Sequence, residues 1–297
     1  MRGLRLDYLR GFVDVIELGS FSAAAERARL TQPAISLQVR RLEDQLGVRL
    51  IERVGRKPRP TAAGTELLDH ARRIDAVVAA ALDAMARHAT GKMGRVRLGS
   101  SASACIHLLP PMLRDLRRRF PTLDITVTTG NSLEITRAVD QGILDLALVT
   151  MPAAGRMLEV TPVLEDELVV IAPPTMRLPA PLTAGALSKL PVLLSEPGGN
   201  TRRLVDRWFA RSRLTLKPAM SLDNVEAIRK LVHAELGCAV IPAIAVRRAS
   251  ERRQLVVCSL SPRLSRTLAV VIRRDRQLTP GMRETRRALL ALATAAA

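Results

Sequence analysis

The stretch LTQPAISLQVRRLEDQLGVRL, residues 30–50, combines a helix-start signal with an amphipathic helical pattern. Thr31 is a good N-cap residue, and Pro33 falls in the first turn of the expected helix, where a missing N–H costs little. Apolar residues then recur at helical steps of four, three and four: Ile35, Val39, Leu42 and Leu46. The stretch therefore predicts a helix over residues 32–46 with one buried face.

The opposite face of this helix carries side chains that can contact DNA. At about 100° per residue, Gln32 lies at the amino end and the outward residues are Pro33, Ser36, Leu37, Arg40, Arg41 and Asp44. Glutamine can pair with adenine through two hydrogen bonds, serine can bond to a base or a phosphate, and an apolar side chain can meet a thymine methyl group. An ordinary solvated basic face has the same pattern, so the helix alone leaves both alternatives open.

The segments on either side of this helix favour DNA binding. Upstream, a helical pattern ends at Gly19, and a short helix with Ser22 as its N-cap follows; the apolar residues of the first pattern are Leu9, Phe12, Val13 and Ile16. Downstream, residues 48–64 have the length and the glycine-containing turn of a β-hairpin, with basic residues near its tip: Arg53, Arg56 and Lys57. This order is that of a winged helix-turn-helix, whose wing contacts the DNA backbone or minor groove.

Residues 12–64, FVDVIELGSFSAAAERARLTQPAISLQVRRLEDQLGVRLIERVGRKPRPTAAG, resemble the N-terminal pattern of the LysR-type transcriptional regulators. The resemblance implies that residues 32–46 are the recognition helix and that Arg53 belongs to the wing. Two positions depart from the pattern: Ile51, where Phe is common, and Pro60, which cannot donate to a strand ladder and predicts a short return strand. The predicted DNA-contacting residues are Ser22, Thr31, Gln32, Pro33, Ser36, Leu37, Arg40, Arg53, Arg56 and Lys57.

Residues 62–89 predict one long helix of about 40 Å, because the segment has no proline and many alanines. Its apolar residues alternate at steps of four and three, as in a coiled-coil seam: Leu67, Ala71, Ile74, Val78, Ala81 and Met85. A helix packed on its own domain would have a wider apolar face. We therefore expect a dimerisation helix, which the family resemblance also implies, and a dimer would place two recognition helices on two half-sites.

The remaining two-thirds of the chain alternate short apolar strands with helices, which predicts an α/β domain. The LysR-type resemblance continues through LLPPMLRDLRRRFP, LDLALV and IRKLVHAELGCAVIPAIAV. It implies a two-lobed, periplasmic-binding-protein-like (type 2) effector domain. The expected organisation is a winged helix-turn-helix in residues 1–61, a linker helix in 62–90 and the effector domain in 91–297, with lobe I at about 91–165 and 266–297 and lobe II at about 166–265.

Polar residues follow several of the expected strands, where ligands bind in such folds because helix N-termini offer free N–H groups. Any one of them could be a plain N-cap, but as a set they predict an effector pocket. Arg202 could pair with a ligand carboxylate or could be a surface arginine. The predicted set is Ser100, Ser101, Ser103, Asn131, Ser132, Thr150, Ser195, Gly198, Thr201 and Arg202.

The net charge of +18 is typical of a protein with a polyanionic partner, but it does not locate the contact. Residues 1–90 hold 15 basic and 11 acidic residues, so most of the surplus lies in residues 91–297. The local density is more informative, because residues 29–59 carry eight basic and three acidic residues. The few aromatic residues disfavour single-strand binding by base stacking.

Other function classes find little support in the sequence. It has no P-loop, GxGxxG, HExxH or GxSxG motif, and its histidines are scattered: His70, His88, His107 and His233. The cysteines, Cys105, Cys238 and Cys258, are too widely spaced for a disulfide framework or a CxxC site, and we interpret them as small buried side chains. No signal peptide or apolar run of membrane-spanning length is found. We expect a cytoplasmic protein that is not an enzyme and needs no cofactor or metal.

These patterns predict a sequence-specific LysR-type transcriptional regulator that binds double-stranded promoter DNA. It would act as a dimer or tetramer, influence RNA polymerase and respond to a small-molecule effector, for which a carboxylate is one candidate class. Two alternatives stay open. The first is a constitutive regulator that needs no effector, and the second is a small-molecule-binding protein or an enzyme on the same two-lobed fold.

Overall fold

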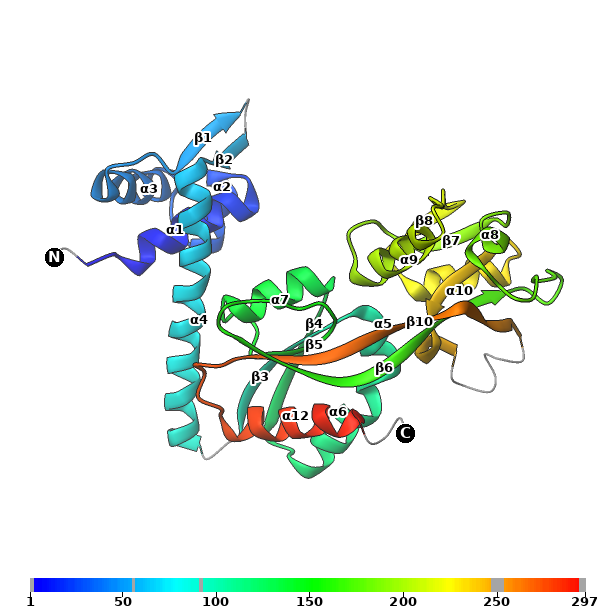
Figure 1. The fold of residues 1–297 in the computed structure, drawn as a ribbon. Coiled ribbons are helices and arrows are strands. Elements are labelled where there is room, and N and C mark those ends of the chain that lie inside the picture. Colours follow the sequence, from blue (N-terminus) through cyan, green and yellow to red (C-terminus); the bar gives the residue numbers. More distant parts are fainter. Residues whose placement is uncertain (1–2, 55–56, 91–92, 247–253, 294–297) are drawn as a thin grey trace. The chain divides into compact units, whose positions relative to one another are not determined.

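The computed structural model describes residues 3–54, 57–90, 93–246 and 254–293. They form two compact units, Met1–Leu82 and Asp83–Ala297, and the long helix α4 (Ala62–Thr90) begins in the first and runs into the second (Figure 1). No helix in these described ranges is long and apolar enough to cross a membrane.

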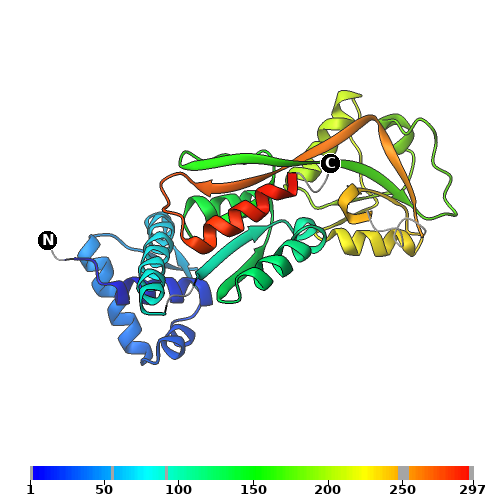
Figure 2. The ribbon, with the colours of Figure 1, turned by 90° about the horizontal axis from the view of Figure 1, so that it is seen from below.

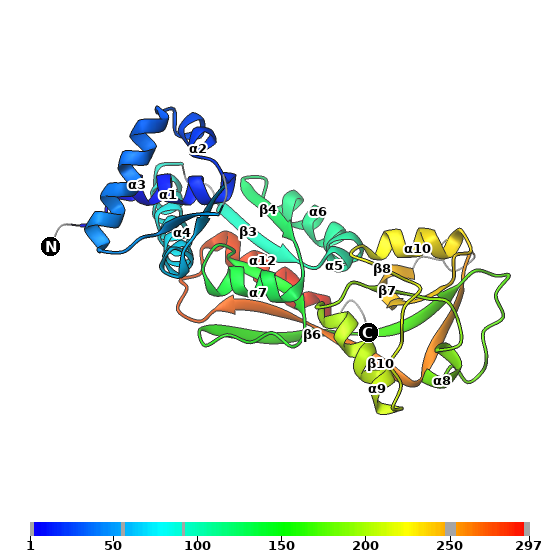
Figure 3. The same cartoon turned by 90° about the horizontal axis from the view of Figure 1, so that it is seen from above.

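Three helices and a hairpin precede α4 in the first unit (Figure 3). They are α1 (Leu6–Leu18), α2 (Phe21–Ala28), α3 (Gln32–Leu46), β1 (Ile51–Val54) and β2 (Lys57–Pro60). The predicted apolar faces of α1 and α3 meet in one core that contains Phe12, Ile35 and Leu42. Leu46, expected on the buried face, is 40% exposed, because α3 ends there and Gly47 turns the chain with a left-handed backbone.

The helix ends differ in two details from the sequence expectations. Ser20, not Ser22, is the N-cap of α2, and its hydroxyl accepts a hydrogen bond from the Ala23 N–H. Ser22 lies inside α2 and is exposed. Thr31 occupies the N-cap position of α3 as expected, but its side chain makes no capping hydrogen bond. The Thr31 hydroxyl is therefore available on the surface at the start of α3.

The hairpin is fixed to α3 by a buried carboxylate. Glu43, near the end of α3, is 7% exposed, and its Oε1 accepts hydrogen bonds from the Leu50 N–H (2.8 Å) and the Ile51 N–H (3.2 Å). Strands β1 and β2 pair in antiparallel fashion with Ile51 opposite Pro60. A proline is tolerated there because each strand of a two-stranded sheet has an unpaired edge. The return strand thus reaches Pro60.

The second unit is built on one mixed eight-stranded sheet with the order β4-β3-β5-β10-β6-β9-β7-β8. Two long antiparallel strands, β6 and β10, run through its middle and are prominent in Figure 2. The strands are β3 (Gly94–Ser100), β4 (Leu123–Thr129), β5 (Leu146–Thr150), β6 (Leu158–Ala172), β7 (Val192–Ser195), β8 (Met220–Leu222), β9 (Cys238–Pro242) and β10 (Val256–Arg273). Strand β10 is continuous through a register shift between Ser259 and Leu264.

Helices cover both faces of each half of this sheet. In the half formed by β4, β3 and β5, the helices α6 (Leu109–Arg119) and α12 (Pro280–Leu290) pack on one face and α7 (Ser132–Asp140) on the other. In the half formed by β9, β7 and β8, α8 (Ala184–Leu187) and α9 (Asn200–Arg211) pack on one face and α10 (Val225–His233) on the other. The other elements that the structure describes here are α5 (Ala102–His107) and the 3-10 helices η1 (Ala243–Val246) and η2 (Ala291–Ala293).

Candidate functional site

The outward face of α3 is polar at its amino end, as the sequence predicts. Gln32 and Pro33 are exposed, Ser36 is half-buried, and Leu37 is 49% exposed. The Gln32 amide donates a hydrogen bond to the Ser36 hydroxyl at 2.8 Å. This bond lies within the exposed face, so the two side chains hold each other in place and keep further donor and acceptor capacity for a partner.

Basic residues lie around this face, but they differ in how free they are. Arg40 is exposed and forms no ion pair with another residue that the structure describes, whereas the Arg41 guanidinium donates to the Tyr8 hydroxyl at 3.2 Å. Lys57, at the start of β2, is exposed. The backbone of Arg53, in β1, lies opposite Pro58 of β2. The side chain of Arg53 and the whole of Arg56 lie outside the described part of the structure.

The predicted coiled-coil seam divides into two parts. Ala71 is completely buried in the core of its own unit, and Leu67 and Ile74 pack half-buried against the same core. This contradicts the expectation that Ala71 faces a second copy, because α4 uses its first turns to close the winged helix-turn-helix. Beyond them Val78 is half-buried, and Ala81 and Met85 are exposed. The large exposed apolar side chains here are Val77 (69%), Leu82 (66%) and Met85 (62%).

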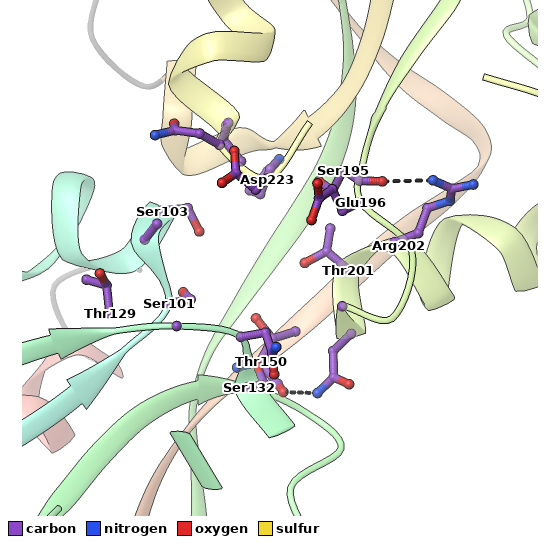
Figure 4. Close-up of a pocket in the computed structure, with 18 of the residues that line it drawn as sticks. Ser101, Ser103, Thr129, Ser132, Thr150, Ser195, Glu196, Thr201, Arg202 and Asp223 are labelled. Atoms are coloured by element: carbon purple, nitrogen blue, oxygen red, sulfur yellow. Dashed lines mark hydrogen bonds between the residues drawn. The ribbon is translucent and has the colours of Figure 1, made fainter. Parts of the chain in front are cut away.

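A polar cavity of about 540 Å³ lies in the second unit, between the two halves of its sheet (Figure 4). Its walls come from the ends of β3, β4, β5 and β7 and from the first turns of α5, α7, α9 and α10. Strand ends meet helix starts here because each βα connection is short. A volume of this size is typical of small-molecule sites.

Eight of the ten residues predicted for an effector pocket line this cavity: Ser101, Ser103, Asn131, Ser132, Thr150, Ser195, Thr201 and Arg202. Ser100 does not line it, since it is completely buried and donates to the Ser101 carbonyl. Gly198 is also absent from the walls, although its neighbour Gly199 is present. Ser101 and Asn131 also act as the N-caps of α5 and α7, so these two residues are both helix caps and cavity-lining residues.

Arg266, on β10, is the central basic residue of the cavity and was missed by the sequence reasoning. Its side chain is 2% exposed, and Nε donates to Asp166 on the adjacent β6 at 2.9 Å. The two terminal nitrogens donate to three hydroxyls of the wall, Ser103 (3.2 Å), Thr201 (3.4 Å) and Thr150 (3.5 Å). Burial lowers the pKa of the guanidinium, and the Asp166 carboxylate opposes this shift.

Arg202 is buried and bonds within the protein, so it is not a surface arginine. It is 8% exposed, pairs with Asp206 at 2.8 Å, and donates to the Ser195 carbonyl at 2.8 Å. Figure 4 shows its guanidinium pointing away from the cavity. Its contacts instead join the first turn of α9 to the end of β7.

Three carboxylates complete the walls: Glu134, Glu196 and Asp223. All three are exposed, and none forms an ion pair within the described part of the chain. The sequence reasoning missed them because it searched strand ends for hydroxyls and amides. Glu134 lies in the first turn of α7 after the N-cap Asn131, Asp223 directly precedes the N-cap Asn224, and Glu196 directly follows β7.

Two further contacts join the halves of the sheet around the cavity. Asn200, at the start of α9, donates to the carbonyls of Thr150 and Pro152 at the end of β5. On another side, His107 Nε2 of α5 lies 3.0 Å from Glu226 Oε1 of α10. With Arg266, these contacts hold the cavity walls in the arrangement seen.

Comparisons with known proteins match both units. The family model "Bacterial regulatory helix-turn-helix protein, lysR family" matches residues 6–65, and "LysR substrate binding domain" matches residues 89–294. The uncharacterized HTH-type transcriptional regulator YeiE of Escherichia coli (strain K12) is 32% identical over 94% of this chain and 95% of the relative. The RuBisCO operon transcriptional regulator of Allochromatium vinosum is 28% identical over 93% of this chain and 92% of the relative.

Solved structures share the fold. The crystal structure of CbnR, a LysR family transcriptional regulator, has a TM-score of 0.73 at 22% identity and covers 96% of this chain and 99% of that chain. Full-length CbnR complexed with its target DNA has a TM-score of 0.72 at 21% identity, with 98% and 100% covered.

Proposed function

Because the chain belongs to the LysR family of DNA-binding transcriptional regulators, we propose that residues 1–61 bind promoter DNA and that α3 reads its bases. The observation that carries this proposal is the exposed pair of Gln32 and Ser36 at the start of α3. Both can bond to base edges, and a helix N-terminus is the part of a recognition helix that contacts bases. Four further residues would complete the surface of α3 that contacts DNA: Thr31, Pro33, Leu37 and Arg40. Ser22, on α2, would lie near the DNA backbone.

The wing has a different role in this proposal. Lys57, Arg53 and Arg56 would contact phosphates or the minor groove and would position α3 without reading sequence. Such contacts release counterions, so they make binding depend on salt whatever the DNA sequence.

The two roles can be separated by equilibrium DNA binding at several salt concentrations. Gln32→Ala with Ser36→Ala is expected to reduce the preference for an operator over unrelated duplex DNA, because base contacts are lost. Lys57→Ala is expected to weaken binding to both duplexes and to lower the salt slope by about one. Glu66→Gln, on an exposed position of α4, is the control. Unchanged preference in the α3 variant would remove Gln32 and Ser36 from base readout.

The rest of the molecule would convert ligand binding into a change at DNA. We place a linker helix in residues 62–90 and an effector domain in 91–297, with its lobes meeting near residues 165 and 266. The exposed apolar residues of α4 would pair two copies, and two dimers could form a tetramer. Promoter binding places this activity in the cytoplasm, where RNA polymerase would respond to the change.

A small molecule in the 540 Å³ cavity is the proposed signal. It can act only if it binds one arrangement of the assembly more tightly than another. Asn200 and Arg266 make hydrogen bonds across the cavity, and such a ligand would strengthen these bonds or replace them.

A further inference from the structure

We propose that the cavity of the second unit takes a small zwitterion, a molecule with an oxyanion at one end and an ammonium group at the other. This inference rests on the proposed role of the cavity as the effector site. It adds the chemical class of the ligand, which follows from how the polar groups of the walls are already satisfied.

The first pole of the cavity is a set of hydroxyl donors held by Arg266. Ser103, Thr150 and Thr201 each accept a hydrogen bond from this guanidinium, which can only donate. Each hydroxyl therefore keeps its own proton, and the described residues supply no acceptor for these protons. Ser103 and Thr150 are only 5% and 2% exposed. Buried donors that line a cavity and lack an acceptor call for an acceptor on the ligand.

The start of α9 adds to this oxyanion pole. Gly199 is its N-cap residue and provides no side-chain cap, so the first N–H groups of this twelve-residue helix are not satisfied by a capping side chain. By contrast, α7 and α10 are capped by Asn131 and Asn224, and each has a glutamate in its first turn. Among these three helices, α9 is the one whose N-terminus remains suited to an anion.

The second pole is acidic and is formed by Glu196 and Asp223, whereas the third acidic residue of the walls, Glu134, lies in the first turn of α7 with Ser132. Glu134, Glu196 and Asp223 line the cavity, while both of its arginines are already paired, Arg202 with Asp206 and Arg266 with Asp166. Figure 4 shows Asp223 and Glu196 across the cavity from Thr150 and Ser132. A carboxylate ligand without a positive charge would meet these acids without a compensating cation. A ligand ammonium would pair with them, while its oxyanion takes the hydroxyl protons.

The test is isothermal titration calorimetry of the full chain with three matched probe series. The first contains linear amino acids from glycine to 6-aminohexanoate, together with the α-amino acids serine and glutamine. The second contains the carboxylates of the same lengths without the amine, and the third contains the corresponding alkylamines. We expect at least one amino acid to bind at least tenfold more tightly than both of its matched probes.

Variants then assign the two poles. Glu196→Gln with Asp223→Asn is expected to weaken the bound amino acid at least tenfold and to leave the matched carboxylate equal or tighter. Thr201→Val is expected to weaken both through loss of a donor. Asp115→Asn, an exposed acid on α6 outside the cavity, is the control and should change neither.

Two results would overturn the proposed ligand class. One is a carboxylate that binds as tightly as its amino acid, with no effect of the acid-neutralising variant; if Thr201→Val still abolishes that binding, the cavity remains the effector site and only its charge preference is wrong. The other is the absence of binding by every probe. DNA binding by α3 is measured separately and stands or falls independently of either result.

Discussion

Arg266 and Asp166 form the buried ion pair where β6 and β10 pass through the middle of the sheet, with register partners at the same two residues. Asp166 also accepts a hydrogen bond from the Ile244 N–H, so both oxygens of the carboxylate are used. A buried pair contributes little net stability compared with apolar residues, but removing one partner leaves an uncompensated charge. Asp166 therefore holds the Arg266 guanidinium in place, and this guanidinium in turn positions the hydroxyl groups of the cavity.

Asp166→Ala is expected to destabilise the second unit by about 3–5 kcal/mol, because Arg266 would be left buried without its counterion. Urea unfolding followed by the fluorescence of Trp208, the one tryptophan of the chain and buried in this unit, measures the change. The exposed pair of Asp124 with Arg95 supplies the control, since Asp124→Ala should cost less than about 1 kcal/mol. A loss of similar size in both variants would contradict the role given to Asp166.

The cysteines make a second prediction at this scale. Burial raises the pKa of the Cys238 thiol to about 11, so the group stays protonated at pH 8 and its reactive thiolate appears only as the pH approaches 11. Cys105 and Cys258 are both half-buried, so of the three cysteines expected to be buried only Cys238 is. Iodoacetamide at pH 8, read out by peptide mass spectrometry, should label Cys238 far more slowly in the native chain than after unfolding. Equal rates would show that Cys238 is not held in the buried site.

At the scale of elements, the start of α4 lies so close to the backbone before β1 that only a glycine fits at the contact. Gly64 lies in the first turn of α4, and a Cβ atom there would lie 2.0 Å from the Leu50 backbone carbonyl oxygen. Backbone cannot move aside as a flexible side chain can. The glycine therefore sets how closely the helix and the wing pack.

Gly64→Ala is expected to destabilise this junction by about 1–3 kcal/mol through overpacking. Hydrogen exchange of the full chain should then be faster in peptides covering residues 48–68, while peptides from the second unit stay unchanged. Gly3→Ala is the matched control, because a Cβ at Gly3 meets nothing within 4 Å. Normal protection in the Gly64 variant would mean that the helix and the wing can separate at no cost.

Local patterns predicted the elements well and their partners poorly. The apolar spacing of Ile35, Val39 and Leu42 predicted the buried face of α3, because a single helix determines which residues share a face. Arg266 could not be found in this way, since its partner Asp166 lies 100 residues away and only strand pairing brings them together. Ala71 was misplaced for the same reason, because one apolar stripe can serve its own core or a second copy.

At the scale of the whole molecule, dimerisation is expected to depend on the second half of α4. Leu82 is 66% exposed in the single chain, and we expect the dimer interface to bury it. Leu82→Glu should therefore shift the full chain from dimer toward monomer in analytical ultracentrifugation, because the apolar contact would be lost. Arg73→Glu puts the same side chain on another exposed position of α4 and should leave the dimer intact. A dimer that persists in the Leu82 variant would assign the interface to another surface.

Sequence reading by α3, in a regulator with paired DNA-binding units, underlies the proposed function. Selection of bound duplexes from a random DNA pool by the full chain tests it most directly. We expect an enriched two-fold symmetric motif whose half-sites lie about one helical turn or a multiple of it apart. We also expect the double variant, Gln32→Ala with Ser36→Ala, to lose or alter the half-site sequence. Sequence reading by α3 would be contradicted if no motif were enriched, or if the double variant enriched the same motif as the unmodified chain.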